Sequence, residues 1–266
     1  GEGNHAQPQL QAGEPGGRGH GKGTVGHELN DYTIMDTKFC LPGWSGSALK
    51  VIAMVSMVTD HIALYFLKDD TFLYGVMRCV GRIAFPVFAF LIAEGFTHTR
   101  NRMRYFLTLL GFAAVSELPW HLLNGSDGTH NVMFTLALGV AVLAAFERLD
   151  GHKVICYCTI LLTAWLATWS GVDYEWRGIL MIVIFYLFQK CGNTFPSHLC
   201  RMAQLLFTFP LMMHYGVIGA MLACTVILFY NGRRGFIQGN VAKYGFYAFY
   251  PAHLFILVII VKYLNL

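Results

Sequence analysis

The sequence predicts an all-α integral membrane protein, a polytopic bundle of about nine transmembrane helices. Hydrophobic residues make up 55% of the chain and charged residues only 13%, whereas a soluble domain usually carries about 25% charged residues. Apolar runs of spanning length recur from residue 46 onwards. Because these runs are too long and too little alternating for a β-barrel, and because lipid cannot satisfy exposed backbone groups, we expect helices.

The chain divides into two expected parts. Residues 1–45 are predicted to be a disordered, Gly-rich cytoplasmic tail and approach segment, since residues 1–27 hold nine glycines and no apolar periodicity. Residues 46–266 are predicted to form the transmembrane domain, in which short links make successive helices antiparallel neighbours. Its expected spans are residues 46–67, 73–97, 103–123, 130–147, 153–170, 174–190, 199–214, 216–231 and 246–264.

Basic residues gather in alternate links. The links after the second, fourth, sixth and eighth segments hold Arg100, Arg102, Arg104, Arg148, Lys153, Lys190, Arg201, Arg233, Arg234 and Lys243. The other links hold only Lys68 and, at a helix edge, Arg177. By the positive-inside rule the amino terminus is cytoplasmic, in a multi-pass protein of the cell (inner or cytoplasmic) membrane. The lipid bilayer is therefore an expected partner, and the net charge of +4 needs no nucleic acid to explain it.

The first two apolar segments carry ionised residues, which are costly inside lipid and are usually retained for function. Asp60 and His61 lie in the first segment, and Arg78 and Arg82 lie in the second. A rise of about 1.5 Å per residue places Asp60, His61 and Arg78 roughly 8–9 Å from the expected outer edge. Arg78 and Arg82 are four residues apart and therefore share a helix face.

Polar residues of the later segments fall in the same outer layer. They are Glu117, with His121 one turn above it on the same face, Asn131, Thr135, Asp173 and Tyr174. Each taken alone has an ordinary structural explanation, such as an Arg78–Glu117 pair between helices or an interhelical Asn bond. The shared depth is what indicates a site. His253 is expected lower, about 10 Å above the inner edge.

A histidine beside an aspartate, with arginines one helix away, suits general-base chemistry on an alcohol or amine. Asp60 is expected to orient His61, and a neighbouring arginine to hold an anionic donor or an oxyanion. No HExxH, GxSxG or Gly-rich phosphate cradle accompanies these residues. The seven scattered cysteines show no CxxC zinc spacing, so no metal is expected.

A transporter or channel with an intramembrane charged pathway, and a non-catalytic scaffold, remain alternatives. A transporter predicts an internal repeat, which the sequence does not show.

Four strings resemble the TraX family over residues 47 to 264. They are LKVIAMVSMVTDHI (49–62), GRIAFPVFAFLIAEGFTHTRNRMRYFLTLL (81–110), NVMFTLALG (131–139) and YPAHL (250–254). The family is similar to transmembrane acyltransferases, and its type member N-acetylates F-type conjugative pilin. The resemblance implies a membrane-embedded acetyltransferase that moves an acetyl group from acetyl-CoA to an amine or hydroxyl. The acceptor would be a pilin-like protein or a cell-surface glycan.

The resemblance also implies site residues. Matches to the family's motifs make His61, Asp60, Arg82 and His253 the expected catalytic residues. Expected substrate-binding residues are Arg78, Glu117, Asn131 and Tyr174. Arg100, Arg233 and Arg234 are placed to attract the phosphates of acetyl-CoA, although a plain topology signal is the favoured explanation of their links.

Overall fold

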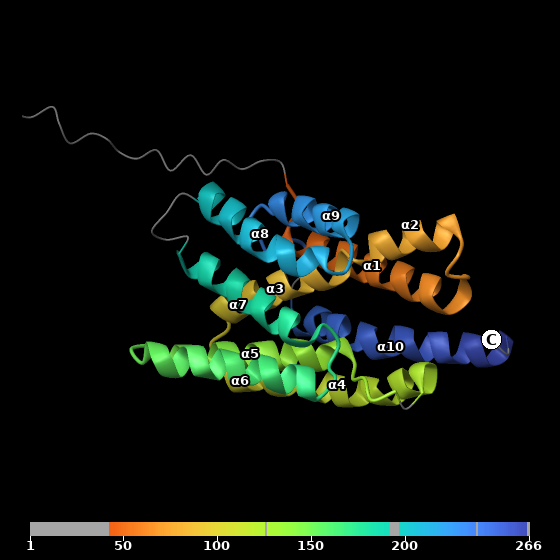
Figure 1. Ribbon diagram of the computed structural model, residues 1–266, viewed down its shortest axis with the longest axis horizontal. Helices are drawn as coiled ribbons and strands as arrows, with labels where there is room; N and C mark the ends of the chain where they lie inside the picture. The colour runs from red at the N-terminus through yellow and green to blue at the C-terminus, as the bar shows by residue number, and fades with distance from the viewer. Residues whose placement is uncertain (1–42, 126, 192–196, 238, 265–266) are drawn as a thin grey trace, which may run out of the picture. The chain divides into compact units, whose positions relative to one another are not determined.

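The computed structural model describes residues 43–125, 127–191, 197–237 and 239–264 (Figure 1). Nearly all of the expected tail, residues 1–42, lies outside the described residues. Within the described ranges the chain forms ten α-helices and no strand beyond isolated bridges. The predicted fold class, a helical membrane protein, is therefore confirmed.

The helices follow the expected segments closely. They are α1 (Gly46–Phe66), α2 (Phe72–Gly81), α3 (Ala84–His98), α4 (Arg102–Asn124), α5 (Val132–Arg148), α6 (Lys153–Trp169), α7 (Glu175–Cys191), α8 (Ser197–Met213), α9 (Val217–Leu228) and α10 (Asn240–Leu264). Two details differ from the expectation. The second segment is divided into α2 and α3, and the last helix begins at Asn240 rather than at residue 246.

Four stretches are long and apolar enough to cross a membrane by length and composition. They are Gly46–Phe66, Phe72–His98, Arg102–Asn124 and Val241–Leu264. Three shorter apolar helices cover Lys153–Trp169, Leu199–Met213 and Val217–Leu228. The described residues thus support membrane insertion, while the count of nine spans stays a prediction.

The division between α2 and α3 has a local cause. Pro86 lies in the first turn of α3, where proline is tolerated, but it cannot bond the carbonyl four residues earlier, that of Arg82. The hydroxyl of Ser56 on α1 donates to the carbonyl of Val80 at 2.6 Å, at the end of α2. A Cβ on Gly81 would lie 2.1 Å from Oδ1 of Asp60, so only glycine allows this approach of α2 to α1.

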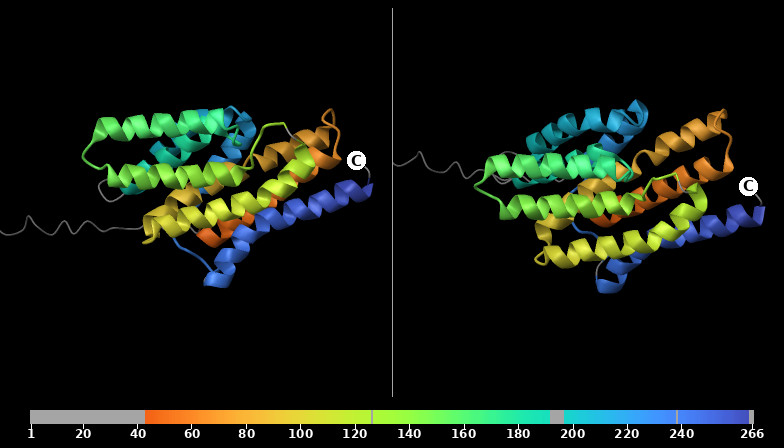
Figure 2. Two further views of the ribbon diagram at one scale, coloured as in Figure 1. Left: turned by 90° about the horizontal axis from the view of Figure 1, so that it is seen from below. Right: turned by 60° about the horizontal axis from the view of Figure 1, so that its bottom comes forward.

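Helix α3 is central in the bundle. Figure 1 shows α4, α5 and α6 running together on one side and α8 and α9 on the other, with α3 and α7 between them. Nine of the fifteen residues of α3 are buried, including Phe85, Phe90 and Phe96. Helix α10 packs on α4 and changes direction in its amino-terminal part (Figure 2). Pro251, which frees the carbonyl of Tyr247, accounts for this bend.

Candidate functional site

A buried pair of histidines joins α1 to α10. Nδ1 of His61 lies 2.8 Å from Nε2 of His253, and the two rings are stacked with centroids 5.0 Å apart. Their exposed fractions are 9% and 7%. The expectation that His253 lies in the inner half, away from His61, is wrong. Because α10 begins at Asn240, His253 sits near the middle of that helix, at the level of His61.

The hydrogen bonds of this pair define its tautomers. Nδ1 of His253 is 3.1 Å from the carbonyl oxygen of Phe249, and a carbonyl can only accept, so this nitrogen carries the proton. In the neutral ring Nε2 of His253 is then an acceptor, and Nδ1–H of His61 donates to it. The lone pair of His61 is therefore left on Nε2. A histidine held in one tautomer with a free lone pair is suited to act as a general base.

Asp60 faces Arg78 and does not orient His61. Its Oδ2 lies 2.5 Å from Nη1 of Arg78, in a salt bridge whose side chains are about one-fifth exposed. The expected Asp60–His61 dyad is wrong because consecutive helical residues point in different directions. The alternative Arg78–Glu117 pair is wrong as well, since Arg78 forms its salt bridge with Asp60. His253, rather than Asp60, contacts Nδ1 of His61 and orients its ring.

Arg82 lies at the break between α2 and α3 and faces the start of α7. Its guanidinium lies near Tyr174 and stands 5.8 Å from the ring centroid of Tyr215. It also lies close enough to Asp60 for their charges to interact. Arg82 is therefore a second cation near Asp60, between α2, α3 and the start of α7.

Tyr174 is held in an uncommon backbone conformation. Its φ is 64° and that of Glu175 is 44°, both in the left-handed region. Its ring stacks on Phe85 with centroids 3.7 Å apart, and its N–H donates to Oδ1 of Asp173 at 3.0 Å. Thr135, expected in the site layer, donates to the Asp173 carbonyl instead. Such conformations cost about 1–3 kcal/mol and gather at functional sites.

Asp173 lies in the link between α6 and α7, next to these groups. Burial raises the pKa of its carboxyl to about 6, while the N–H of Tyr174 and the charge of Arg82 oppose that rise. Asp173 was placed with Tyr174 in the expected outer polar layer, but it was not among the expected catalytic or binding residues.

Glu117 and Asn131 belong to a separate cluster at the carboxyl-terminal part of α4. Oε1 of Glu117 contacts His121, at 3.1 Å, and His130, while Oε2 accepts from the Asn131 side chain at 2.6 Å. The predicted shared face of Glu117 and His121 is confirmed. His130 was missed although it opens the expected segment 130–147; in the structure it lies in the link before α5.

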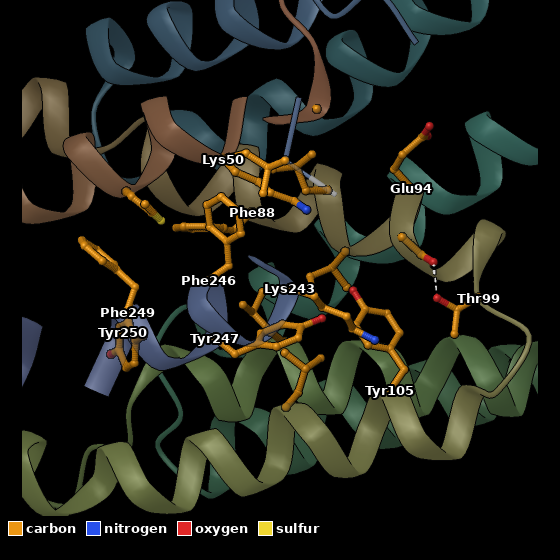
Figure 3. Close-up of a pocket in the computed structure, with 18 of the residues that line it drawn as sticks. Lys50, Phe88, Glu94, Thr99, Tyr105, Lys243, Phe246, Tyr247, Phe249 and Tyr250 are labelled. Carbon is orange, nitrogen blue, oxygen red and sulfur yellow. Dashed lines mark hydrogen bonds between the residues drawn. The ribbon is translucent and has the colours of Figure 1, made fainter. Parts of the chain in front are cut away.

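A cavity of about 480 Å³ lies next to the histidine pair and is within the size range of small-molecule sites. Neither His61 nor His253 lines it, but Phe249 and Tyr250 do, and their rings contact that of His253. Figure 3 shows Lys50, Lys243 and Glu94 towards one end of it and Phe249 and Tyr250 towards the other. Most of its lining between these ends is apolar, including Met54, Met57, Phe88, Leu91 and Val132. Phe249 lies one helical turn before His253, so the apolar end reaches the neighbourhood of the pair.

Only part of the expected phosphate-binding set lines this cavity. Arg234 does, whereas Arg100 and Arg233 are exposed and are not among its lining residues. Lys50 and Lys243 line it and were missed. The signal that could have found them is their position in the first turns of apolar helices, where a side chain reaches back along the helix.

The link that carries Arg233 and Arg234 also closes the start of α1. The N–H of Gly46 donates to the carbonyl of Arg233 at 2.8 Å, and that of Ser47 donates to Arg234 at 3.0 Å. These bonds satisfy N–H groups that a helix start leaves without partners. The basic link is thereby fixed beside Lys50.

Comparison with known proteins gives consistent matches. The TraX protein family matches residues 45–261. The probable fimbrial assembly protein FimC, serogroup H1, of Dichelobacter nodosus is 31% identical over 80% of this chain and 94% of its own length. Protein TraX of Escherichia coli is 29% identical over 61% of this chain and 63% of its own length. An uncharacterized protein of Rickettsia prowazekii is 27% identical over 52% of each chain. No solved structure matches this chain.

Proposed function

The chain belongs to the TraX family, and from this membership and the geometry around His61 we propose that it is a membrane-embedded acetyltransferase. The family is associated with conjugation and the F pilus, and one relative is named for fimbrial assembly. We propose acetyl-CoA as the donor and an amine or hydroxyl of a pilin-like protein or cell-surface glycan as the acceptor. The basic end of the cavity would face the cytoplasm of a cell whose inner membrane holds the protein.

The observation that carries the proposal is the hydrogen-bond geometry of the histidine pair, from which we infer its tautomers. Nε2 of His61 takes the proton of the acceptor's hydroxyl or amine as its oxygen or nitrogen attacks the thioester carbonyl. When the tetrahedral intermediate collapses, the carbon–sulfur bond breaks and the proton passes from His61 to the CoA thiolate. His253 keeps Nδ1 of His61 occupied, so Nε2 is available in each cycle.

Arg78 and Arg82 have different roles in this scheme. Arg78 is engaged by the carboxylate of Asp60 at 2.5 Å, so its role is to hold the wall formed by α1 and α2. Arg82 lies near Tyr174 and Asp60, and we assign it the task of stabilising the oxyanion. Preorganised cations of this kind are worth more in a water-poor site than in bulk solvent.

The cavity suits the donor. Lys50, Arg234 and Lys243 at its polar end supply positive charge for the phosphates of CoA. The apolar passage suits the pantetheine arm, which would bring the acetyl group to Phe249 and Tyr250. We therefore move the proposed donor contacts from Arg100 and Arg233 to Lys50 and Lys243, and we retain Arg234.

The test uses membranes that contain the full chain, with labelled acetyl-CoA supplied to the cytoplasmic face. The wild type is expected to transfer label to membrane or surface material, and His61→Ala to lose at least 10²-fold in rate. His152→Ala, which removes an exposed histidine before α6, is the matched control and should keep full activity. Equal incorporation by His61→Ala and the wild type would contradict the proposal. A wild type that transfers no label to any membrane, pilin or glycan material would also contradict it.

A further inference from the structure

A second histidine cluster has the composition of a metal site. Glu117, His121 and His130 place one ligand atom each within 4.8 Å of one another. Glu117 and His121 are one turn apart on α4, and His130 lies in the link before α5. The Glu117 side chain is 18% exposed and both histidines are 40% exposed, so the cluster is formed by the fold yet open to solvent on one side.

The histidine on α4 presents a lone pair to the carboxylate. Nδ1 of His121 lies 3.3 Å from the carbonyl oxygen of Gly125, which can only accept, so Nδ1 carries the proton. Nε2 then faces Oε1 of Glu117 at 3.1 Å. Two acceptors at this separation repel each other unless a cation or a second proton lies between them. A positive charge between Nε2 of His121 and Oε1 of Glu117 would therefore stabilise this arrangement.

Outer hydrogen bonds fix the carboxylate as well. Asn131 is fully buried and donates to Oε2 of Glu117 at 2.6 Å and to the carbonyl of Ala113 at 2.9 Å. Its own oxygen accepts from the N–H of Met133 and caps α5. Oε1 of Glu117 is thus left for the two histidines. Metal ligands are commonly held in this way, a histidine by a carbonyl and a carboxylate by a donor.

We propose that Glu117, His121 and His130 bind a Zn²⁺ ion whose fourth position is open to solvent. Two imidazole nitrogens and one carboxylate oxygen form a known zinc ligand set. Zinc bonds of about 2.0–2.2 Å place tetrahedral ligand atoms roughly 3.3–3.5 Å apart, close to the 3.1 Å between His121 and Glu117. The short contact between Glu117 and His130 would lengthen as the ion enters between them.

The ion would tie the last turns of α4 to the link that begins α5. The ligands come from an i, i+4 pair and from a residue nine positions further along the chain, so they show neither CxxC nor HExxH spacing. This spacing explains why the sequence led us to expect no metal. The inference does not depend on acyl transfer.

The test measures Zn²⁺ binding by the purified full chain in detergent, prepared without a polyhistidine tag. The wild type is expected to bind one equivalent that His121→Ala and His130→Ala each weaken at least tenfold. His214→Ala, an exposed histidine after α8, is the matched control and should bind as the wild type does. Affinity should also fall as the pH is lowered, because the ligands must lose their protons to bind.

Two further measurements make the result independent of folding defects. Co²⁺ in place of Zn²⁺ should give a visible spectrum of four-coordinate geometry in the wild type and lose it in His130→Ala. Added Zn²⁺ should raise the melting temperature of the wild type and leave that of both ligand variants unchanged. A wild type without this equivalent of Zn²⁺, or ligand variants that bind it equally well, would overturn the proposal in favour of a protonated histidine cluster.

Discussion

The two histidine pairs of this protein differ in what surrounds them. His61 and His253 are buried, stacked at 5.0 Å and joined directly at 2.8 Å, and the chain of hydrogen bonds ends on a carbonyl. His121 and His130 are half-exposed, 6.3 Å apart in an edge arrangement, and share the carboxylate of Glu117. A carbonyl stabilises a neutral ring with a free lone pair, whereas a carboxylate attracts a cation. The same residue type thus serves as a proposed base in one pair and as a proposed ligand in the other.

The largest expected effect tests whether His253 positions His61. We expect His253→Ala to lower the rate of acetyl transfer about 10²-fold, because Nδ1 of His61 loses its acceptor and the ring can adopt the other tautomer. His253→Gln should restore most of this rate, since its amide oxygen can accept the same bond. Both kcat and the KM for acetyl-CoA are measured. We expect kcat to fall and KM to stay unchanged. A loss shared equally by both variants would indicate a packing role for His253 instead.

A second prediction separates the donor end of the cavity from both histidine pairs. Lys50→Ala should raise the KM for acetyl-CoA about tenfold, as removal of one phosphate contact does, and leave kcat unchanged. Arg100→Ala, which removes an exposed arginine outside the cavity lining, is the control of equal charge. An equal rise in KM for both variants would show that the links attract the donor only through their overall charge.

A third prediction concerns Asn131, which supports only the half-exposed pair. Asn131→Ala should weaken Zn²⁺ binding about 10–100-fold, because the carboxylate of Glu117 loses its buried donor. It should also lower the free energy of unfolding by about 1–3 kcal/mol through the lost cap and the unpaired groups. Metal titration and thermal unfolding in detergent measure these two quantities. Unchanged Zn²⁺ affinity would mean that Asn131 does not order the carboxylate.

Much of the fold could be predicted because apolar run length determines where membrane helices form. Every expected segment corresponds to a helix, and only the second is divided. The division at Arg82 depends on Pro86 together with contacts to Ser56 and Asp60 on another helix, and no sequence window contains all of these. The early start of α10 was missed because the glycines before residue 246 resemble a link.

The candidate site was only partly predictable. Residues four apart on one helix, such as Glu117 and His121, could be placed together from periodicity alone. The partners of Asp60 and His61 could not, because adjacent residues on a helix face different neighbours. His253 is 192 positions from His61, and its depth was misjudged with the start of α10. His130 carries no periodic signal because it lies in a link.

The central claim is that His61 is neutral and bears its lone pair on Nε2. The most direct test is nitrogen-15 NMR of histidine-labelled protein in lipid, with the His61 signals identified by their absence in His61→Ala. We predict a protonated Nδ1 that is hydrogen-bonded to His253 and an unprotonated Nε2 at neutral pH. A proton on Nε2, or an imidazolium with both nitrogens protonated, would contradict the assignment of His61 as the base.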